Sequence, residues 1–218
     1  MTIESAAQKM DRIYRYQRGI YDLTRRYYLL GRATLIADLA PPPTGTILEV
    51  GCGTASNLIA AARAYPGARL YGLDVSAEML ATAKQAVARR SLENRIHLAS
   101  ADATTFDGQS VFNVGAFDRI FASYMLSMVP QWPRVIDAMI RNLADGGSIH
   151  IVDFGDCERL PTWFRKTLYR WLGAFHVTPR QDLHEQLKDY AGQHRLELTH
   201  TPLWRGYAHY AVLSRGDC

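Results

Sequence analysis

The sequence predicts an α/β fold in which a mostly parallel sheet carries helices on both faces. Three observations support this prediction: short apolar segments alternate with helix-like segments, a glycine turn follows the first strand, and two neighbouring strands come last. Alternation of this kind implies right-handed crossovers and favours parallel strands. At 218 residues, the chain is long enough to bury one core without disulfides or metals.

The predicted elements begin after the break PPPTG at residues 41–45, which suits neither a helix nor a central strand. Strand-like patterns lie at residues 46–50, 68–75, 95–102, 117–124 and 147–154. Helix-like patterns lie between them at residues 55–65, 77–90 and 133–144.

The last third of the sequence departs from strict alternation. Two helices are predicted at residues 160–177 and 179–193, followed by strands at 196–203 and 207–213. The short connection WRG between these strands favours an antiparallel hairpin at the end of the sheet. We therefore predict an N-terminal helical extension or lid over residues 1–40, whose helix runs to about residue 39. A domain over residues 41–218 follows, with a helical insertion at about 158–194.

Composition and charge exclude several classes of protein. The apolar share of 48% and charged share of 21% are typical of a globular protein, and the net charge of +4 permits an anionic partner without requiring one. Three scattered cysteines without a CxxC pair favour reduced thiols and a cytoplasmic location. No metal-binding motif occurs, so no metal is predicted. The polar N-terminus and the lack of a run of about 18 apolar residues predict neither a signal peptide nor a membrane span.

The strongest local motif is LEVGCGTASN at residues 48–57, between a predicted strand and a predicted helix. Gly51 and Gly53 allow a tight turn that brings backbone N–H groups close to a ligand. Asp74 ends the next strand, 21 positions after Gly53, where a carboxylate can accept both hydroxyls of a ribose. Ser56 replaces the third glycine of a dinucleotide motif. A structural turn with a helix-capping aspartate is the alternative interpretation.

The motifs EVGCGT, GLDVSAEML and ADA resemble those of class I S-adenosylmethionine-dependent methyltransferases. The resemblance implies a Rossmann-like sheet of seven strands, mostly parallel with a final antiparallel strand, and S-adenosyl-L-methionine as the cofactor. It places Gly51, Cys52 and Gly53 at the methionine part and Asp74 at the ribose. It also places residues at the adenine and at the sulfonium. Val75 and Met79 would lie beside the adenine, and Asp102 and Ala103 at its amino group. Ser123 and Tyr124 would face the sulfonium. We assign Glu49 and Arg32 to the same cofactor site.

A narrower resemblance extends from about residue 10 to residue 213. Segments such as FDRIFASYMLSMVPQW, IHIVDFG and WFRKTLYRWLGAFHVTPR are similar to bacterial betaine-lipid N-methyltransferases, which trimethylate the amino group of diacylglycerylhomoserine. The opening YDLTRRYYLLGR is also similar to the aminocarboxypropyl transferases that build that head group. The resemblance implies a small-molecule or lipid head-group amine as the substrate. Neither the pattern nor the composition predicts an oligomeric state.

The opening segment is rich in tyrosine and arginine. Residues 9–32 carry seven basic and two acidic side chains, and the spacing of Tyr14, Tyr21 and Tyr28 interleaves with that of Arg18, Arg25 and Arg32. On one helix these six side chains form a single alternating face. Aromatic faces attract cations and arginine binds carboxylates, so this face suits a zwitterionic ligand. Packing of the tyrosines on the sheet edge, with arginines reaching water, is the alternative.

Methyl transfer to an amine requires alignment of nitrogen, methyl and sulfur, and a deprotonated amine. We predict Tyr21, Tyr28 and Tyr124 as the catalytic residues, lining a pocket that holds the growing ammonium charge. No histidine or carboxylate in the motifs stands out as the base, which leaves Tyr124, or solvent reached through Ser123, as the acceptor.

The predicted helix at residues 160–177 carries a stripe of large apolar side chains with basic residues elsewhere: Leu160, Phe164, Leu168, Trp171 and Phe175, with Arg165, Lys166 and Arg170. This pattern is typical of an interfacial helix that contacts an anionic bilayer, and equally of a helix that faces the core. A lipid substrate favours peripheral contact at the inner membrane face.

Three other functions remain open from the sequence. The enzyme could transfer or cyclise the aminocarboxypropyl arm of the same cofactor, methylate a small molecule of specialised metabolism, or bind the cofactor without catalysis. Nucleic-acid methylation is disfavoured, because the fourth predicted strand ends FASY instead of the NPPY-type tetrad and no RNA-binding module is recognised.

Overall fold

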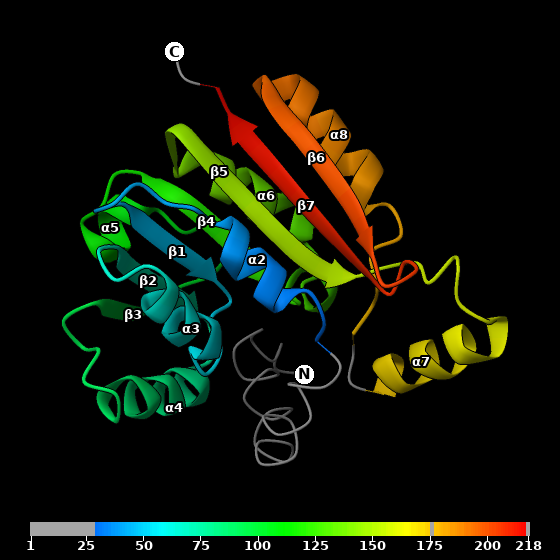
Figure 1. Ribbon diagram of the computed structural model, residues 1–218, viewed down its shortest axis with the longest axis horizontal. Helices are drawn as coiled ribbons and strands as arrows, with labels where there is room; N and C mark the ends of the chain where they lie inside the picture. The colour runs from blue at the N-terminus through cyan, green and yellow to red at the C-terminus, as the bar shows by residue number, and fades with distance from the viewer. Residues whose placement is uncertain (1–28, 175–176, 217–218) are drawn as a thin grey trace, which may run out of the picture.

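The computed structural model describes residues 29–174 and 177–216, and its centre is a seven-stranded sheet with the order β3-β2-β1-β4-β5-β7-β6 (Figure 1). The strands are β1 (Thr46–Val50), β2 (Arg69–Asp74), β3 (Ile96–Ser100), β4 (Phe117–Ser123), β5 (Leu143–Phe154), β6 (Leu196–Leu203) and β7 (Ala208–Arg215). Strands β1 to β5 pair in parallel, and β7 pairs antiparallel with both β5 and β6. The predicted fold class is confirmed, including the final antiparallel strand, which lies between β5 and β6.

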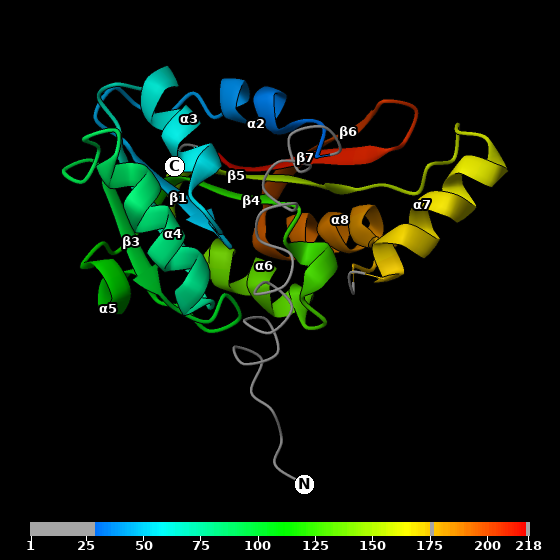
Figure 2. The same ribbon diagram turned by 90° about the horizontal axis from the view of Figure 1, so that it is seen from below.

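Helices cover both faces of the sheet (Figure 2). One face carries α2 (Arg32–Asp38), α3 (Ser56–Ala64) and α4 (Ala77–Ala88), and the other carries α5 (Gly108–Phe112), α6 (Trp132–Arg141) and α8 (Leu183–His194). Central strand β1 is buried at all five positions, with Ile47 in the first core and Leu48 in the second. Burial on both faces is what a parallel strand between two helical layers requires.

The helix predicted to run through to about residue 39 is interrupted. Gly31 has φ of 86°, and α2 begins at Arg32 directly after it, so no single helix connects residues 29–31 to α2. A Cβ at Gly31 would lie 2.9 Å from Val152 Cγ2, which shows how closely this turn approaches β5. Leu35 and Leu39 are buried beneath α2. The predicted Tyr/Arg face therefore cannot continue on one helix as far as Arg32, and its other five members lie outside the described residues.

Helix α7 (Thr162–Ala174) packs on the core through a stripe of apolar side chains. This stripe differs at one position from the stripe that the sequence predicts. Phe164 and Leu168 are partly buried against the first core, and Leu172 is buried there. Trp171, which the prediction placed on this stripe, is 39% exposed. Phe175 lies outside the described residues. Spacing of four from Phe164 to Leu168 to Leu172 explains the difference, because those three side chains share one helical face.

Candidate cofactor and substrate site

The glycine turn between β1 and α3 has the backbone that the sequence predicts. Gly51 and Gly53 have φ of 73° and 51°, and both the Gly51 and Cys52 amides donate to the Leu73 carbonyl at 2.9 Å. A Cβ at Gly51 would lie 2.5 Å from Met125 Cγ. The turn therefore requires glycine at position 51 for both its φ and its space. Its left-handed backbone continues at Ala55, with φ of 61°.

Asp74 joins the glycine turn to the start of α4. Its Oδ2 accepts from the Gly53 amide at 2.8 Å, and its Oδ1 accepts from the Ser76 amide at 2.9 Å. Ser76 then caps α4 by accepting from the amide of Met79, which is buried, whereas Val75 is half-buried. Each carboxylate oxygen can accept more than one hydrogen bond, so the two amide bonds are compatible with the predicted contact between Asp74 and a ribose. The half-buried carboxylate lies at the carboxyl edge of the parallel strands, where the sequence predicted it.

Glu49 and Cys52 lie beneath the turn. Glu49 is buried, and its Oε1 accepts from the Asn57 amide group at 2.8 Å, which fixes the start of α3 against β1. Burial, and then the charges of Asp74 and Glu49, raise the pKa of the Cys52 thiol well above its usual value. Cys52 is therefore a neutral wall of the site and an unreactive thiol at neutral pH.

Asp102 and Ala103 follow β3 at the same edge of the sheet. The exposed Asp102 side chain accepts from the Thr104 amide at 2.8 Å and from its hydroxyl at 2.7 Å. The Ala101 amide donates to the Asp74 backbone carbonyl at 3.2 Å. These bonds hold the segment 101–104 beside the end of β2, which is where the predicted adenine contacts would have to lie.

Ser123 and Tyr124 end β4 next to the glycine turn. Ser123 is buried, and its hydroxyl has no hydrogen-bond partner among the described residues. Tyr124 has φ of 54°, and its hydroxyl donates to the Leu30 carbonyl at 2.5 Å. Arg32 donates through Nε to the Leu29 carbonyl at 3.1 Å, and its charge acts on the Tyr124 phenol. The structure therefore brings Ser123, Tyr124 and Arg32 together where the segment 29–32 crosses the edge of the sheet.

The environment of Tyr124 does not favour the predicted role of general base. Burial raises the pKa of Tyr124 far above its usual value, and the charge of Asp153 and the nearby Tyr207 raise it further, against a smaller lowering by Arg32. The phenol is therefore neutral at physiological pH and already donates its proton to Leu30. Tyr21 and Tyr28, the other predicted catalytic residues, lie outside the described residues.

A row of three aromatic rings, which sequence reasoning did not find, runs along this edge. The Tyr124 and Phe154 ring centroids are 4.6 Å apart, and those of Phe154 and Tyr207 are 6.1 Å apart, both pairs edge-to-face. Phe154 ends β5 and Tyr207 precedes β7, so the topology brings together Phe154 and Tyr207, which are 53 positions apart. Burial raises the pKa of Tyr207 to about 12, which keeps this ring neutral. No short motif carries this signal.

The residues present fit S-adenosyl-L-methionine. A glycine turn without room for a Cβ, a half-buried carboxylate at a strand end and a buried serine hydroxyl lie along adjacent strands β2, β1 and β4. Together these groups offer a backbone turn that a ligand can approach closely, a carboxylate for the ribose and a polar group at the reacting end.

Comparisons with known proteins agree with this site. Residues 47–147 match the sequence profile described as a methyltransferase domain. The chain is 35% identical over 109 residues to phosphatidylethanolamine N-methyltransferase of Cereibacter sphaeroides, covering 50% of each chain. It is 33% identical over 135 residues to nocamycin O-methyltransferase of Saccharothrix syringae, covering 60% of this chain and 46% of that one. The chain thus spans half or less of the length of these relatives.

Among solved structures, the fold resembles phosphoethanolamine N-methyltransferase 2 of Haemonchus contortus with bound S-adenosylhomocysteine. The TM-score is 0.76 at 15% identity, and the match covers 99% of this chain and 61% of that one. The same protein has been solved with S-adenosyl-L-methionine, with a TM-score of 0.73. The matched domain and the relatives support the predicted methyltransferase class and its cofactor, S-adenosyl-L-methionine, and the solved structures support the fold.

Proposed function

We propose that this chain, which carries a methyltransferase domain on the fold of S-adenosylmethionine-dependent methyltransferases, is an N-methyltransferase. Its substrate would be the amino group of a homoserine-type betaine-lipid precursor. The observation that carries the proposal is the aromatic row of Tyr124, Phe154 and Tyr207, which lies beside the cofactor cradle. An amine gains permanent charge as it is methylated, and neutral aromatic faces stabilise ammonium groups.

Each part of the cradle has a defined task in this proposal. Gly51, Gly53 and Asp74 would hold the cofactor, which supplies a methyl group on a positively charged sulfur. Ser123 offers a buried hydroxyl at the reacting end, and the crossing segment 29–32 covers Tyr124 through the bond to Leu30. Covering the site excludes water and fixes the nitrogen in line with the methyl group, which is most of what such a displacement requires.

The aromatic row suits an ammonium better than an alcohol. The three neutral rings are buried in the first core, and the Tyr124 hydroxyl is engaged by Leu30, so this side of the site is a largely apolar aromatic wall. Cation–π attraction contributes about 0.5–2 kcal/mol per ring, depending on desolvation. The name of the Cereibacter sphaeroides relative, an N-methyltransferase of an amine-bearing lipid, supports an amine acceptor. The homoserine head group is supported by the resemblance of the segments around residues 117–132, 149–155 and 163–180.

A basic aromatic face next to the site supports a lipid as the carrier of that amine. On α7, Trp163, Lys166 and Arg170 share the side opposite the core stripe, and Trp163 is 70% exposed. Trp204, 48% exposed, lies at the β6–β7 turn, which pairs with the segment before α7 through the Arg159 amide and the Arg205 carbonyl at 3.3 Å. Exposed tryptophan beside basic residues favours the surface of an anionic bilayer. None of the helices in the described ranges is long and apolar enough to cross a membrane.

The acceptor is tested by supplying vesicles that contain diacylglycerylhomoserine, phosphatidylethanolamine or diacylglycerol, together with methyl-labelled cofactor. Label is expected in the homoserine lipid, at most weakly in phosphatidylethanolamine, and not in diacylglycerol, which offers only a hydroxyl. Preferential labelling of phosphatidylethanolamine would show that ethanolamine, instead of homoserine, is the head group of the substrate. Labelling of diacylglycerol would overturn amine methylation.

A further inference from the structure

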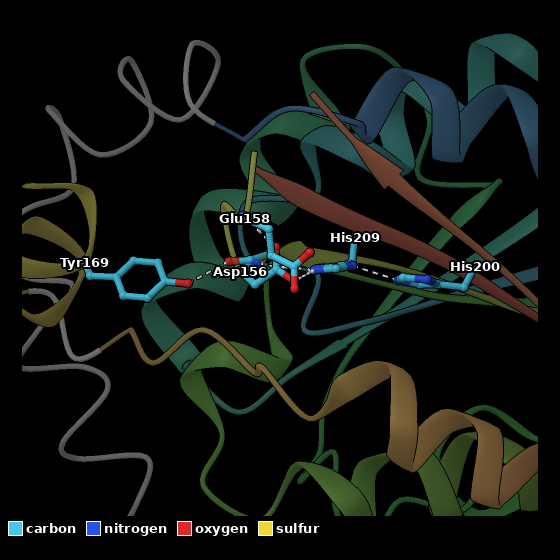
Figure 3. A network of polar contacts seen from close by, with 6 residues as sticks. Asp156, Glu158, Tyr169, His200 and His209 are labelled. Carbon is cyan, nitrogen blue, oxygen red and sulfur yellow. Dashed lines mark hydrogen bonds and ion pairs between the residues drawn. The ribbon is translucent and has the colours of Figure 1, made fainter. Parts of the chain in front are cut away.

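Two histidines and an aspartate form a hydrogen-bonded chain next to the aromatic row (Figure 3). His209 Nδ1 lies 2.7 Å from His200 Nε2, and His209 Nε2 lies 3.7 Å from Asp156 Oδ2. His209 belongs to β7, His200 to β6, and Asp156 to the loop after β5. The sequence assigned no chemical role to any of these three residues.

The hydrogen bonds assign the tautomer of His209. The Asp156 amide donates to His209 Nε2 at 3.3 Å, so Nε2 is an acceptor and the ring proton is on Nδ1. That proton is donated to His200 Nε2. His209 Nε2 can therefore take up a proton. It would then lose the long hydrogen bond from the Asp156 amide and form an ion pair with the Asp156 carboxylate.

The inner end of this chain adjoins the aromatic row. Asp156 is two residues from Phe154, and the Gly155 amide between them donates to the Tyr207 carbonyl at 2.9 Å. The Tyr169 hydroxyl of α7 donates to the Gly155 carbonyl at 3.1 Å, and the Asp156 side chain is 28% exposed. The outer end reaches α8, where the exposed His184 ring stacks on His200 at 4.2 Å.

The groups that face His209 raise or lower its pKa. Burial lowers the pKa of His209, Asp156 and Glu158 raise it, and His184 lowers it. Burial, then His209 and His184, lower the pKa of His200 to about 4, so His200 stays neutral and remains an acceptor when His209 becomes charged. Within the described residues, no group of three or more such side chains is arranged to hold a metal ion, and these rings stack instead of converging.

We propose that Asp156 and His209, supported by His200, are the acceptor of the proton that the substrate ammonium must lose before methyl transfer. This inference rests on the proposed function. One N–H bond of the ammonium breaks, the electron pair stays on nitrogen, and the proton passes through the Asp156 carboxylate to His209 Nε2. The resulting imidazolium is paired with Asp156 and donates to neutral His200. The nitrogen pair then forms the bond to the methyl group as the bond to sulfur breaks, and the proton returns to water through Asp156. Each successive methylation repeats the cycle.

The first test is the pH profile of kcat/KM for His209→Gln, with His184→Gln as the matched control. The wild-type profile is expected to have an acidic limb that lies below the ordinary pKa of histidine, because burial lowers the pKa of His209, and a plateau above it. His209→Gln should lose that limb, fall roughly 10²-fold at pH 7 and recover part of the loss by pH 9.5, where water and hydroxide accept the proton. Binding of S-adenosylhomocysteine should not change. His184→Gln removes an exposed ring that stacks on His200 without bonding His209 or Asp156. It should keep the acidic limb, moved slightly to higher pH because His184 lowers the pKa of His209, and stay within about twofold of wild type on the plateau.

A second measurement does not depend on turnover. Nitrogen-15 spectra should show His209 in the Nδ1–H tautomer, and Asp156→Asn should lower its pKa, because the carboxylate that stabilises the imidazolium is gone. An active wild type with an unchanged profile in His209→Gln, or a His209 pKa indifferent to Asp156→Asn, would overturn this inference alone. A wild type that methylates neither the homoserine lipid nor phosphatidylethanolamine would overturn the proposed function and this inference with it.

Discussion

The Gly53 amide donates a hydrogen bond to Asp74 Oδ2 at 2.8 Å, which connects the end of β2 directly to the glycine turn after β1. One carboxylate thus shapes the turn that would hold the methionine part of the cofactor, and in our proposal the same carboxylate binds the ribose. Asp74→Ala is expected to weaken S-adenosylhomocysteine binding roughly 10- to 100-fold, since hydrogen bonds to charged groups contribute about 1.5–3 kcal/mol each.

Calorimetric titration measures this effect, and Asp107→Asn is the control. Asp107 also caps a helix, accepting from the Ser110 amide at 3.1 Å, but it does so at α5, away from the glycine turn. Equal affinities of Asp74→Ala and wild type would show that the carboxylate is only structural.

Gly51→Ala is expected to destabilise the protein by about 1–3 kcal/mol, because the new methyl group meets Met125 and the residue keeps a positive φ. Urea unfolding measures the change. Gly173→Ala on α7 is the matched control, since nothing lies within 4 Å of its added methyl group, and it should be neutral or stabilising by up to about 1 kcal/mol. Similar stabilities of the two variants would contradict the close approach of Met125.

The variant Tyr124→Phe distinguishes two roles for Tyr124, lining the site or accepting the substrate proton as a general base. Its phenol is neutral across the physiological range because burial holds its pKa far above the usual value. The variant should therefore keep the wild-type pH profile of kcat and lose about 1 kcal/mol of stability with the bond to Leu30. Tyr124→Ala, which removes the ring, should raise KM for the amine. Loss of a titrating limb in Tyr124→Phe would restore tyrosine as the base.

His150 makes the fold sensitive to acid. It is buried on β5, between the Ser148 hydroxyl at 2.8 Å and the Tyr210 hydroxyl at 2.8 Å, and burial with the charge of Arg119 lowers its pKa to about 4. Unfolded chains bind this proton at pH about 6.5, so stability is complete above that value and falls as pH decreases to about 4. The total effect is about 3 kcal/mol.

Urea unfolding of wild type and His150→Gln between pH 7.5 and 4.5 tests this dependence. The difference in stability between the two proteins should narrow as pH falls, because the variant has no imidazole to protonate. A difference that stays constant with pH would show that folding does not lower the pKa of His150.

Binding to vesicles tests the basic aromatic face. Lys166→Glu with Arg170→Glu should abolish most sedimentation with vesicles of phosphatidylglycerol and phosphatidylcholine, since each basic residue near an anionic surface contributes about 1 kcal/mol. Arg89→Glu with Arg90→Glu at the end of α4 makes the same charge change elsewhere and should bind normally. Equal binding of both double variants would remove α7 from any membrane contact.

The elements that the sequence predicted well are those whose burial is governed by one repeating pattern. Strands β1 and β6 have the predicted ends, because β1 is a short segment between the PPPTG break and the glycine turn and β6 is followed by a short turn. Helix α5 and the 3₁₀ turn at Leu126–Met128 were missed, since five and three residues carry too little periodicity. The interruption at Gly31 depends on close contact with Val152, which no local pattern reveals.

The candidate site also contains residues that the sequence predicted and residues that it did not. The cradle of Gly51, Gly53 and Asp74 could be predicted because its residues lie in short motifs at strand ends. The aromatic row and the pair Asp156 and His209 could not, because they depend on β7 lying beside β5, and that neighbourhood is a property of the topology. On α7, Leu172 instead of Trp171 faces the core, a difference of one residue that the spacing alone left open.

The by-product of the reaction tests the central claim most directly. Incubation with S-adenosyl-L-methionine and vesicles of diacylglycerylhomoserine, followed by mass analysis of both products, distinguishes which bond to sulfur breaks. The account predicts S-adenosylhomocysteine in equal amount to the methyl groups gained by the amine. Methylthioadenosine, with the aminocarboxypropyl arm transferred and no methylated lipid, would contradict it.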